Sequence, residues 1–485
     1  MVIPHLEFVA EPVPDATPLC VDLDGTLLRT DLLLESLFAL LRQNALYVFL
    51  LPLWLAAGKA HFKQAIAQRV DLSVELLPFN EPFLAHLRRE RRDGRRLVLA
   101  TASNEKFAGQ IARHLGIFDR VLASDAVANL SAHRKCEKLV ETFGDRGFDY
   151  AGNAKADVPI WAHARHALVV SPQAGVLKKA ESVANVSAVF DDRRPGLRLY
   201  LKAMRLHQWV KNLLVFVPVA TAHELLNPDR LIDAALAFVC FGVCASSVYL
   251  LNDLLDLSED RRHPTKRKRP LAAGAIPVAH AAWLIPSLLV TAFQVALSLP
   301  LQFLAVLALY WLGTLAYSLR LKRAPMVDVL VLAGLYTARV IGGAMAGSIA
   351  PSFWLLAFSM FLFLSLALVK RYSELLIAQK CAGSTTPGRG YEVQDMEALA
   401  QFGAASGYMA VLVLALYINS EQVRTMYSHP EAIWLLCPLL LYWTSRVWLL
   451  ARREQMHEDP VVFAIEDRRS HLIAVLALLS IWLAV

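Results

Sequence analysis

Closely spaced apolar segments fill the chain beyond residue 195, and they constrain its fold more than any other feature. The chain has 485 residues, 56% of them hydrophobic. Several segments come near the ~20 residues that a helix needs to span a bilayer. They lie at about 210–222, 234–251, 277–297, 300–317, 327–347, 352–369, 403–418, 431–445 and 471–485. The sequence therefore predicts a mostly soluble domain over residues 1–195 and an all-α polytopic membrane domain of about nine transmembrane helices over residues 196–485.

Lys and Arg are distributed unevenly among the loops between these segments. Residues 1–15 lack the basic start and apolar core of a signal peptide, so we expect a cytoplasmic N-terminus. The loops that then lie inside hold 18 Lys and Arg, whereas the outside loops hold only Arg230 and Arg424. The positive-inside rule therefore predicts a multi-pass protein of the inner membrane, with its N-terminal domain and its charged clusters on the cytoplasmic side.

An acidic block directly follows the second apolar segment and reads NDLLDLSEDRRHPTKRKRP over residues 252–270. Asp253, Asp256 and Asp260 are spaced i, i+3 and i+7, so a continuing helix would place them on one face. Three adjacent carboxylates repel one another unless a cation lies between them. Dense oxygen ligands of this kind suit Mg²⁺, which usually also takes phosphate oxygens from a substrate.

Six Lys and Arg follow Asp260 within ten residues, and they are ready partners for phosphate charge. A solvated cytoplasmic loop is the plainer interpretation of these cations. Such a loop needs basic residues but no row of carboxylates, so the block favours a site for Mg²⁺ and a phosphorylated substrate.

The soluble part begins with an apolar run that ends in Asp22-x-Asp24-Gly-Thr, which resembles the first motif of the haloacid dehalogenase superfamily, mostly phosphatases. The later strings LVLATAS and AGNAKAD are similar to its second and fourth motifs, and a lysine between them fits the third. The motif residues are Asp22, Asp24, Thr101, Lys135, Asn153 and Asp157.

This resemblance implies a phosphatase site in which Thr101 and Lys135 contact the phosphate. Asp22 would attack phosphorus to form an aspartyl phosphate, and Asp24 would protonate the leaving alcohol and then activate water. Asp22, Asp24 and the fourth motif would hold Mg²⁺. That motif usually begins with an acid, but here it begins with Asn153, whose neutral amide binds Mg²⁺ less tightly. An active phosphatase and a scaffold that has lost activity both stay open.

The alternating strand and helix patterns of residues 1–195 predict a doubly wound α/β sheet. Residues 30–93 are too long for a simple crossover, so we expect a helical cap there. Within the cap, LYVFLLPLWLAA (46–57) is very apolar but too short to span a bilayer. It would lie in the membrane interface or form a buried cap helix, and the pattern favours neither.

From about residue 200 to its end the chain resembles the UbiA superfamily of intramembrane prenyltransferases. The strongest mark is the block Asn-Asp-x-x-Asp-x-x-x-Asp, which starts at Asn252 and which binds Mg²⁺ and a diphosphate in that superfamily. The resemblance implies nine helices around a central cavity, with Mg²⁺ and diphosphate held at this block.

The second polar motif differs from that of aromatic prenyltransferases, which usually carry another Asp-x-x-x-Asp. Here Asp328 is followed four residues later by Leu332, and Arg339 lies three helical turns after Asp328. The string YSLRLKRAPMVDVLVLAGLYTARVIGGA is similar to the decaprenyl-phosphate phosphoribosyltransferase branch. So are RLHQWVKN, HPTKRKRPLAAG, KRYSEL and EDPVVFAIEDR.

That branch implies transfer of 5-phosphoribose from phosphoribosyl diphosphate to a polyprenyl phosphate, with release of diphosphate. Both substrates are anionic, and cations at or near the cytoplasmic helix ends are expected to bind them. These cations are Lys211, Lys266, Arg269, Lys322, Arg323, Arg339, Lys370 and Arg371. Asp328 would bind the ribose hydroxyls or help hold the metal, and this choice stays open. The N-terminal domain would then remove the 5-phosphate.

Two other functions are weighed against this one. An aromatic prenyltransferase is disfavoured by Leu332. A transporter or lipid-binding protein would tend to place its polar groups near the membrane midplane, whereas these lie mostly at one edge. The expected partners are the bilayer and the two substrates, without nucleic acid, and a homo-oligomer stays open. The string CAGSTTPGRGYE (381–392) is expected to be a flexible loop that closes over the soluble substrate.

Overall fold

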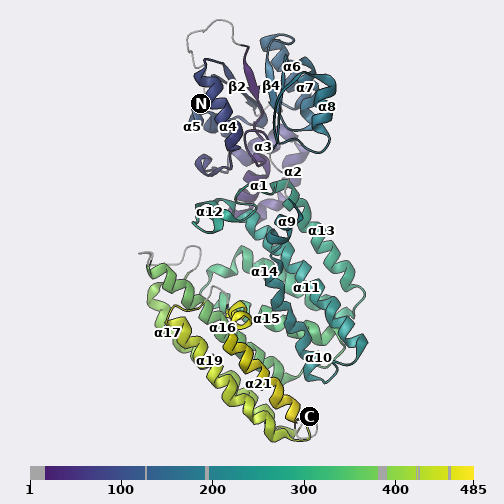
Figure 1. The fold of residues 1–485 in the computed structure, drawn as a ribbon, viewed down its shortest axis with the longest axis vertical. Coiled ribbons are helices and arrows are strands. Elements are labelled where there is room, and N and C mark those ends of the chain that lie inside the picture. Colours follow the sequence, from purple (N-terminus) through teal and green to yellow (C-terminus); the bar gives the residue numbers. More distant parts are fainter. Residues whose placement is uncertain are drawn as a thin grey trace. The chain divides into compact units, whose positions relative to one another are not determined.

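The computed structural model describes residues 17–125, 128–191, 196–380, 390–421, 423, 427–456 and 460–484. The chain divides into two compact units, Met1–Met204 with Tyr249–Leu284 and Arg205–Val248 with Ile285–Val485 (Figure 1). The expected domain boundary at 195 lies outside the described residues, as do most of the expected closing loop (381–389) and the first two residues of EDPVVFAIEDR.

A parallel sheet forms the centre of the first unit, and its six strands have the order β3-β2-β1-β4-β5-β6. Leu19 of β1 pairs with Leu97 of β2 on one side and with Asp149 of β4 on the other. The order changes direction beside β1, and in such sheets ligands bind at the carboxyl ends of the strands at this point. The strands are β1 (Leu19–Val21), β2 (Leu97–Asn104), β3 (Arg120–Ser124), β4 (Asp149–Gly152), β5 (Ala167–Val170) and β6 (Val186–Phe190).

Helices alternate with these strands, and the predicted doubly wound α/β class is confirmed. Between β1 and β2 the chain forms α1 (Leu32–Gln43), η1 (Ala45–Phe49), α2 (Leu51–Ala56), α3 (Lys59–Ala67), η2 (Val74–Leu76) and α4 (Glu81–Arg92). The later helices are α5 (Glu105–Leu115), α6 (Ala132–Phe143), η3 (Lys155–Asp157), α7 (Val158–His163), α8 (Val176–Val183) and α9 (Leu197–Ala203). Asp31 accepts a hydrogen bond from the N–H of Leu34 and so caps α1.

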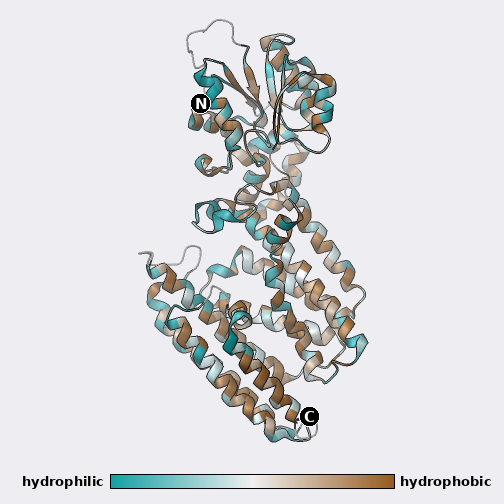
Figure 2. Cartoon of the chain, in the orientation of Figure 1, coloured by the Kyte–Doolittle hydropathy of each residue, from teal (hydrophilic) through white to brown (hydrophobic). Residues whose placement is uncertain are grey.

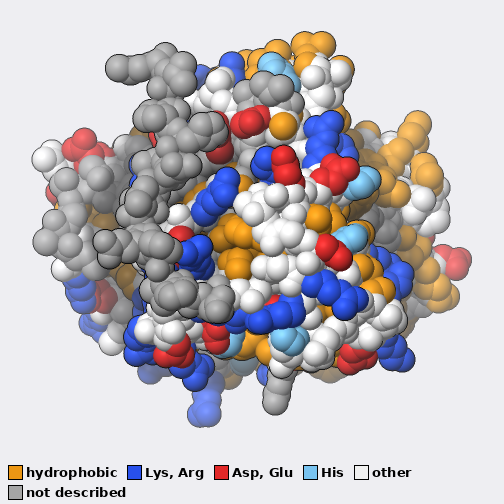
Figure 3. Space-filling view, turned by 90° about the horizontal axis from the view of Figure 1, so that it is seen from above, with side chains coloured by type: hydrophobic (Ala, Val, Ile, Leu, Met, Phe, Trp, Pro, Cys, Tyr) orange, Lys and Arg blue, Asp and Glu red, His pale blue; other side chains and the backbone are white. Residues whose placement is uncertain are grey.

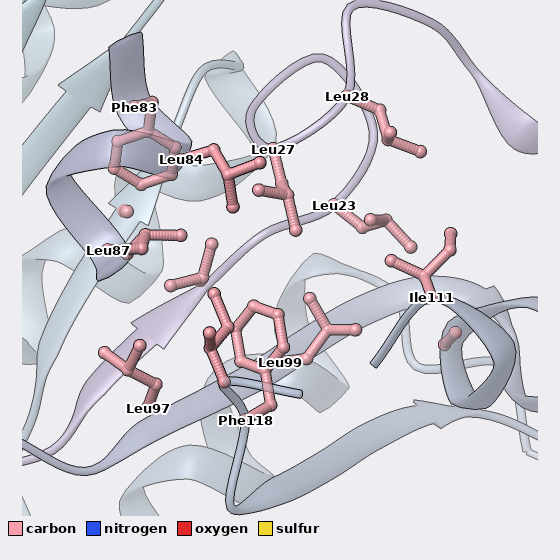
Figure 4. Packing of buried hydrophobic residues seen from close by; sticks show 14 of the residues in the cluster. Leu23, Leu27, Leu28, Phe83, Leu84, Leu87, Leu97, Leu99, Ile111 and Phe118 are labelled. Carbon is pink, nitrogen blue, oxygen red and sulfur yellow. The ribbon is translucent and has the colours of Figure 1, made fainter. Parts of the chain in front are cut away.

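Leucine and phenylalanine side chains from β1, β2, α4 and α5 pack together on one side of the sheet (Figure 4). Leu23, Leu27 and Leu28 come from the segment after β1 and are fully buried in this cluster. The loop that carries the first motif is therefore anchored by its leucines, which holds its carboxylates at the end of β1.

Long apolar helices dominate the rest of the chain, and most of their length is coloured hydrophobic in Figure 2. The elements are η4 (Leu206–Phe216), α10 (Val217–Thr221), α11 (Pro228–Leu255), α12 (Leu257–Arg262), η5 (Lys266–Lys268), α13 (Val278–Ala296), α14 (Leu301–Leu319), η6 (Leu321–Arg323), α15 (Val327–Ala346), α16 (Phe353–Lys380), η7 (Val393–Asp395), α17 (Met396–Ile418), η8 (Pro430–Leu435), α19 (Leu436–Arg452), α20 (Pro460–Glu466) and α21 (Arg468–Ala484). The predicted all-α membrane domain is confirmed.

Within the described residues, seven helices are long and apolar enough to cross a membrane, so the predicted number of nine is not confirmed. The two predicted spans that fall short are the first and the last. The first is divided between η4 and α10, and the last, α21, has 17 residues. Pro218 at the start of α10 cannot donate a backbone hydrogen bond, which helps to explain why the first segment is not one long helix.

Charged side chains of both signs are interspersed with apolar ones on the face drawn in Figure 3. This mixture is typical of a solvated surface, in contrast to the apolar helices of the membrane domain.

Candidate functional sites

The first candidate site lies where β1 ends, at the change of strand order. Asp22 follows β1 directly, and Lys135 on α6 donates a hydrogen bond of 2.7 Å from Nζ to its Oδ1 atom. The same ammonium lies 3.7 Å from Oδ1 of Asp157. Lys135 is buried, and although burial lowers its pKa, the two carboxylates outweigh that effect and raise it. The first, third and fourth motifs are thus brought together around one buried ammonium group.

Asp24 is held by two hydrogen bonds from other elements. Its Oδ1 atom accepts the N–H of Leu32 at 2.8 Å, and its Oδ2 atom accepts the hydroxyl of Ser103. Burial and the nearby Asp31 raise the pKa of Asp24 to about 7, although both hydrogen bonds oppose the shift. Burial also raises the pKa of Asp22 to about 6 against the pull of Lys135. A carboxyl group with a pKa near neutrality is suited to proton transfer.

The fourth motif contributes Asp157, which bonds to its own loop, and Asn153, whose amide lies beside the first motif. Asp157 accepts the N–H groups of Asn153 and Ala154 at 3.0 and 2.9 Å and the hydroxyl of Tyr150 at 2.9 Å, so it shapes the loop. The Asn153 amide lies against Gly25, where a Cβ atom would come within 2.2 Å of its Nδ2. Because Gly25 also has φ +76°, only glycine suits this position.

The second motif supplies more than the predicted Thr101, which is fully buried within β2. The N–H of Ser103 donates to the Thr101 hydroxyl at 3.0 Å, and the Ser103 hydroxyl reaches Asp24. Lys63 on α3 donates to the carbonyl of Ala102 at 2.6 Å, and burial lowers its pKa. Lys63 and Ser103 line a small pocket beside Asp24. The LVLATAS string could have indicated Ser103, but nothing in the sequence indicated Lys63.

The second candidate site is the acidic block, which in the structure lies across a break between two helices. Helix α11 ends at Leu255 and α12 begins at Leu257, yet the N–H of Asp256 still bonds to Asn252 and that of Asp260 to Asp256. The backbone therefore almost follows the predicted continuing helix.

Each of the three carboxylates of the acidic block pairs with an arginine side chain. Arg269 Nη1 lies 3.2 Å from Asp253 and 2.6 Å from Asp260, both of which are buried. Asp256 instead pairs with Arg42 of α1 at 3.2 Å. Burial raises the pKa of Asp260, and Arg269 partly offsets this. Two of the predicted metal ligands thus share one cation, and the third faces another.

Oxygen donors suited to Mg²⁺ are present in both sites. The buried Oδ1 atom of Asn252 has no hydrogen-bond partner in the described part of the chain. Carboxylates, an amide oxygen and backbone carbonyls match the ligands that Mg²⁺ prefers. Within the described residues, no three His, Cys, Asp or Glu side chains converge closely enough to hold a metal ion in this conformation. The residue types fit Mg²⁺, and arginine or lysine now provides the positive charge beside them.

Two buried clusters in the second unit hold further predicted residues. Asp328 is fully buried and accepts Arg371 Nε and the Tyr391 hydroxyl, each at 2.5 Å. Arg371 also donates to Tyr317 at 2.7 Å and to Glu374 at 2.5 Å. Two residues predicted as separate substrate contacts therefore bind each other. Tyr391 lies within the expected closing loop (381–392) but was not predicted as a site residue, and it is buried here.

Arg339 forms the second cluster inside α15. Its Nε donates to Asn212 at 2.8 Å and its Nη2 to the Tyr310 hydroxyl at 2.7 Å, and its guanidinium also stacks on Tyr336. Lys211 lies over the same Tyr336 ring at 5.8 Å. A charge within an apolar helix is costly unless it is paired, and this arginine is fully supported by polar and aromatic groups.

The remaining predicted cations are more accessible: Lys266, Lys322 and Arg323 lie in short 3₁₀ helices, and Lys370 lies within α16. Lys266 and Arg323 are exposed, whereas Lys322 and Lys370 are half-buried. Their positions suit contacts with a soluble anion.

Comparisons with known proteins identify both domains. Residues 213–383 match the UbiA prenyltransferase family, and residues 19–160 match the haloacid dehalogenase-like hydrolases. Over 462 residues the chain is 36% identical to the uncharacterized protein y4nM of Sinorhizobium fredii, covering 95% of this chain and 89% of that one. It is 38% identical over 190 residues to a decaprenyl-phosphate phosphoribosyltransferase of Corynebacterium glutamicum, covering 37% of this chain and 55% of the relative. A solved structure, a UbiA homologue from Archaeoglobus fulgidus bound to GPP and Mg²⁺, aligns with a TM-score of 0.46 and 19% identity, covering 58% of this chain and 99% of that one.

Proposed function

Because the chain belongs to the UbiA prenyltransferase family and carries an N-terminal haloacid dehalogenase-like domain, we propose that it is a polyprenyl-phosphate phosphoribosyltransferase. It would transfer 5-phosphoribose from phosphoribosyl diphosphate to a polyprenyl phosphate on the cytoplasmic side of the inner membrane. The similarity to the Corynebacterium glutamicum phosphoribosyltransferase carries this proposal. The supply of cations supports it, since both substrates carry several negative charges.

The acidic block would serve the leaving group. Asp253, Asp256, Asp260 and the amide oxygen of Asn252 would hold Mg²⁺, which neutralises a leaving diphosphate when it is bound. Arg269 already lies against two of these carboxylates, and the exposed Lys266 would bind further phosphate oxygens.

The bond changes require little help from an acid or base. An oxygen of the lipid phosphate forms a bond to the anomeric carbon of ribose, while the bond from that carbon to the diphosphate oxygen breaks and diphosphate leaves with the electron pair. The lipid phosphate is already ionised, so no proton has to be removed from it. The work of the chain is therefore to position two anions and reduce their repulsion, as in other phosphate chemistry.

Asp328 has a supporting role in this proposal. Its two carboxylate oxygens are bonded to Arg371 and Tyr391, which favours positioning of Arg371 over direct metal binding. Arg339 and Lys211, grouped around Tyr336, would face the phosphates of a substrate.

The N-terminal domain would remove the 5-phosphate from the lipid product. Asp22 would attack phosphorus, and Asp24, whose pKa is raised to about 7, would protonate the leaving alcohol. Asp22, the Asp24 carbonyl and Asn153 would hold Mg²⁺ there, with Asp157 shaping the loop. Thr101 and Lys135 would contact the phosphate.

The decisive experiment supplies purified protein with labelled phosphoribosyl diphosphate, Mg²⁺ and a polyprenyl phosphate and determines the lipid product by mass. A phosphoribosyl or ribosyl lipid is expected. A parallel reaction contains 4-hydroxybenzoate and a polyprenyl diphosphate. Alkylation of the aromatic compound, without sugar transfer, would show that the chain belongs to the aromatic branch and that the proposal is wrong.

A further inference from the structure

The short segment between α1 and α3 presents an apolar face outward. None of the residues of η1 or α2, all of which the structure describes, is buried. The side chain of Phe49 is 73% exposed, and those of Leu46 and Leu53 are each 65% exposed. We call this surface the Phe49 face; it consists of Leu46, Val48, Phe49, Leu50, Leu53 and Leu55. The alternative of a buried cap helix is therefore excluded for these side chains.

The opposite side of the same segment is packed against the cap, so the segment has a defined orientation. Tyr47, Leu51 and Trp54 contact a small core of Leu40, Ile66 and Val70. The guanidinium of Arg69 lies over the Trp54 ring at 4.9 Å. Because one side is anchored, the exposed leucines and Phe49 cannot simply turn inward.

The Phe49 face begins beside the end of a helix that is long and apolar enough to span a membrane. Arg42 donates to the carbonyl of Leu255, the last residue of α11, at 3.2 Å, and Leu46 comes only four residues after Arg42. The 28 residues of α11 extend to ~42 Å, longer than the ~30 Å hydrocarbon core, so its end is expected in the headgroup region.

A buried ion pair fixes α1 in this position. Arg261 of α12 donates from Nη1 and Nη2 to Glu35 of α1 at 2.9 and 2.6 Å, and both side chains are buried. The Phe49 face therefore starts only four residues after Arg42, which contacts the end of α11.

We propose that the Phe49 face inserts into the boundary between headgroups and acyl chains of the lipid bilayer. A short segment with an apolar outer side and cations at its ends is suited to this position. The exposed Lys59 at one end can meet anionic headgroups, whereas Arg42 at the other end pairs with Asp256 and Glu259. Continuity with the end of α11 favours lipid over a protein partner as the occupant.

This anchoring has a consequence for the phosphatase-like site. Helix α1 starts at Leu32, whose N–H binds Asp24, and ends just before the Phe49 face, a length of ~18 Å. A face seated in the lipid would keep the site within about that distance of the bilayer, where a lipid substrate resides. The anchoring itself does not depend on the proposed reaction.

The test places a fluorescent label at Phe49→Cys in the full chain reconstituted into vesicles. Val189→Cys on β6 is the matched control, since Val189 is also exposed, and the unsubstituted chain measures background labelling. Lipids brominated on their acyl chains should quench the Phe49→Cys label at least about twofold more than the control label, because bromine quenches only groups within the bilayer. Iodide in solution should quench the control label more strongly.

Two results would overturn the proposal. Strong iodide quenching at Phe49→Cys without quenching by brominated lipid would show a solvated face. Protection from both quenchers would show that a protein surface or a second copy covers it. Because a label can disturb packing, hydrogen exchange of residues 45–57 is also compared between vesicles and a detergent that leaves the cap exposed. Equal exchange in both would likewise contradict insertion.

Discussion

The two acidic sites of the first unit are built in opposite ways. The phosphatase-like site gathers side chains from distant parts of the chain, so that Asp22 meets Lys135 across 113 positions. The acidic block takes its carboxylates from eight consecutive residues, which pair with the nearby Arg269 and with the distant Arg42. In the first site, the sheet sets the geometry. In the second, the sequence sets the carboxylates and the tertiary structure decides which cation each one faces.

Helix α1 takes part in both sites. Its first N–H binds Asp24, and Arg42 in its last turn binds Asp256. Glu35 in its first turn pairs with Arg261, which directly follows the last carboxylate of the block. A change in α1 can therefore reach either site, whereas a change at one set of carboxylates should affect one reaction only.

Asp22→Asn should produce the largest and most selective effect. Loss of the nucleophile should lower dephosphorylation at least ~10³-fold, because no aspartyl phosphate can form. Transfer should continue, so mass analysis should find the 5-phosphorylated lipid accumulating. If wild type and variant accumulate the same 5-phosphorylated lipid at saturating Mg²⁺, the domain is a scaffold and the comparison of two active sites fails.

Asp256→Asn should have the reverse selectivity. Transfer should fall at least ~100-fold if the bound cation contributes several kcal/mol to stabilising the transition state. Excess EDTA should stop transfer in the wild type. Asp229→Asn, at the other end of α11, is the matched control and should transfer normally. Near-normal transfer by Asp256→Asn, or full activity in EDTA, would show that the acidic block does not hold a required metal ion.

Glu35→Gln should weaken the element that the two sites share. The substitution leaves the buried Arg261 without its counter-charge, and breaking such a pair typically costs about 3–5 kcal/mol. Denaturant unfolding followed by circular dichroism should show a lower midpoint. The matched control is Glu141→Gln, which removes an exposed pair with Lys138 and should change the midpoint little. A midpoint equal to the control's would mean that α1 is held mainly by other contacts.

The smallest expected difference between the two sites is in the pH dependence of their reactions. Asp24 must be protonated to act as an acid, and burial and Asp31 raise its pKa to about 7. The pKa of the nucleophile Asp22 is about 6, and Asp22 must be ionised to attack. The first chemical step should therefore be fastest between about pH 6 and pH 7, and it should fall about tenfold per pH unit above this range as Asp24 ionises and below it as Asp22 becomes protonated. Single-turnover phosphate transfer measures this step. Transfer of the sugar should not follow the same curve, since it requires no such acid.

Local patterns predicted much of this molecule. The apolar lengths indicated membrane helices, and the Asp22-x-Asp24 string after an apolar run indicated a strand with carboxylates at its end. Parallel strands bring their carboxyl ends to one edge, so motifs on separate strands could be expected to meet. The hydrogen bond from Ser103 of β2 to Asp24, just after β1, agrees with that expectation.

Other expectations depended on information that periodicity does not contain. The number of spans differed at the two ends of the membrane domain, where η4 with α10 and the 17-residue α21 replace single long segments. Arg371 and Asp328 lie 43 positions apart, and the sequence predicts that each contacts the substrate separately, but they bind each other. Burial makes such pairing necessary, since an unpaired charge in a low-dielectric interior is costly.

The sequence by itself determined the domain types and the candidate residues for the chemistry, because strand and helix periods and short motifs are local properties of a chain. Only the tertiary structure decided that Arg269 lies between Asp253 and Asp260, that Arg42 faces Asp256, and that the Phe49 face stays exposed. These outcomes depend on which distant elements pack together. That choice is made by burying the most apolar surface while pairing every buried charge, and it is a property of the whole fold.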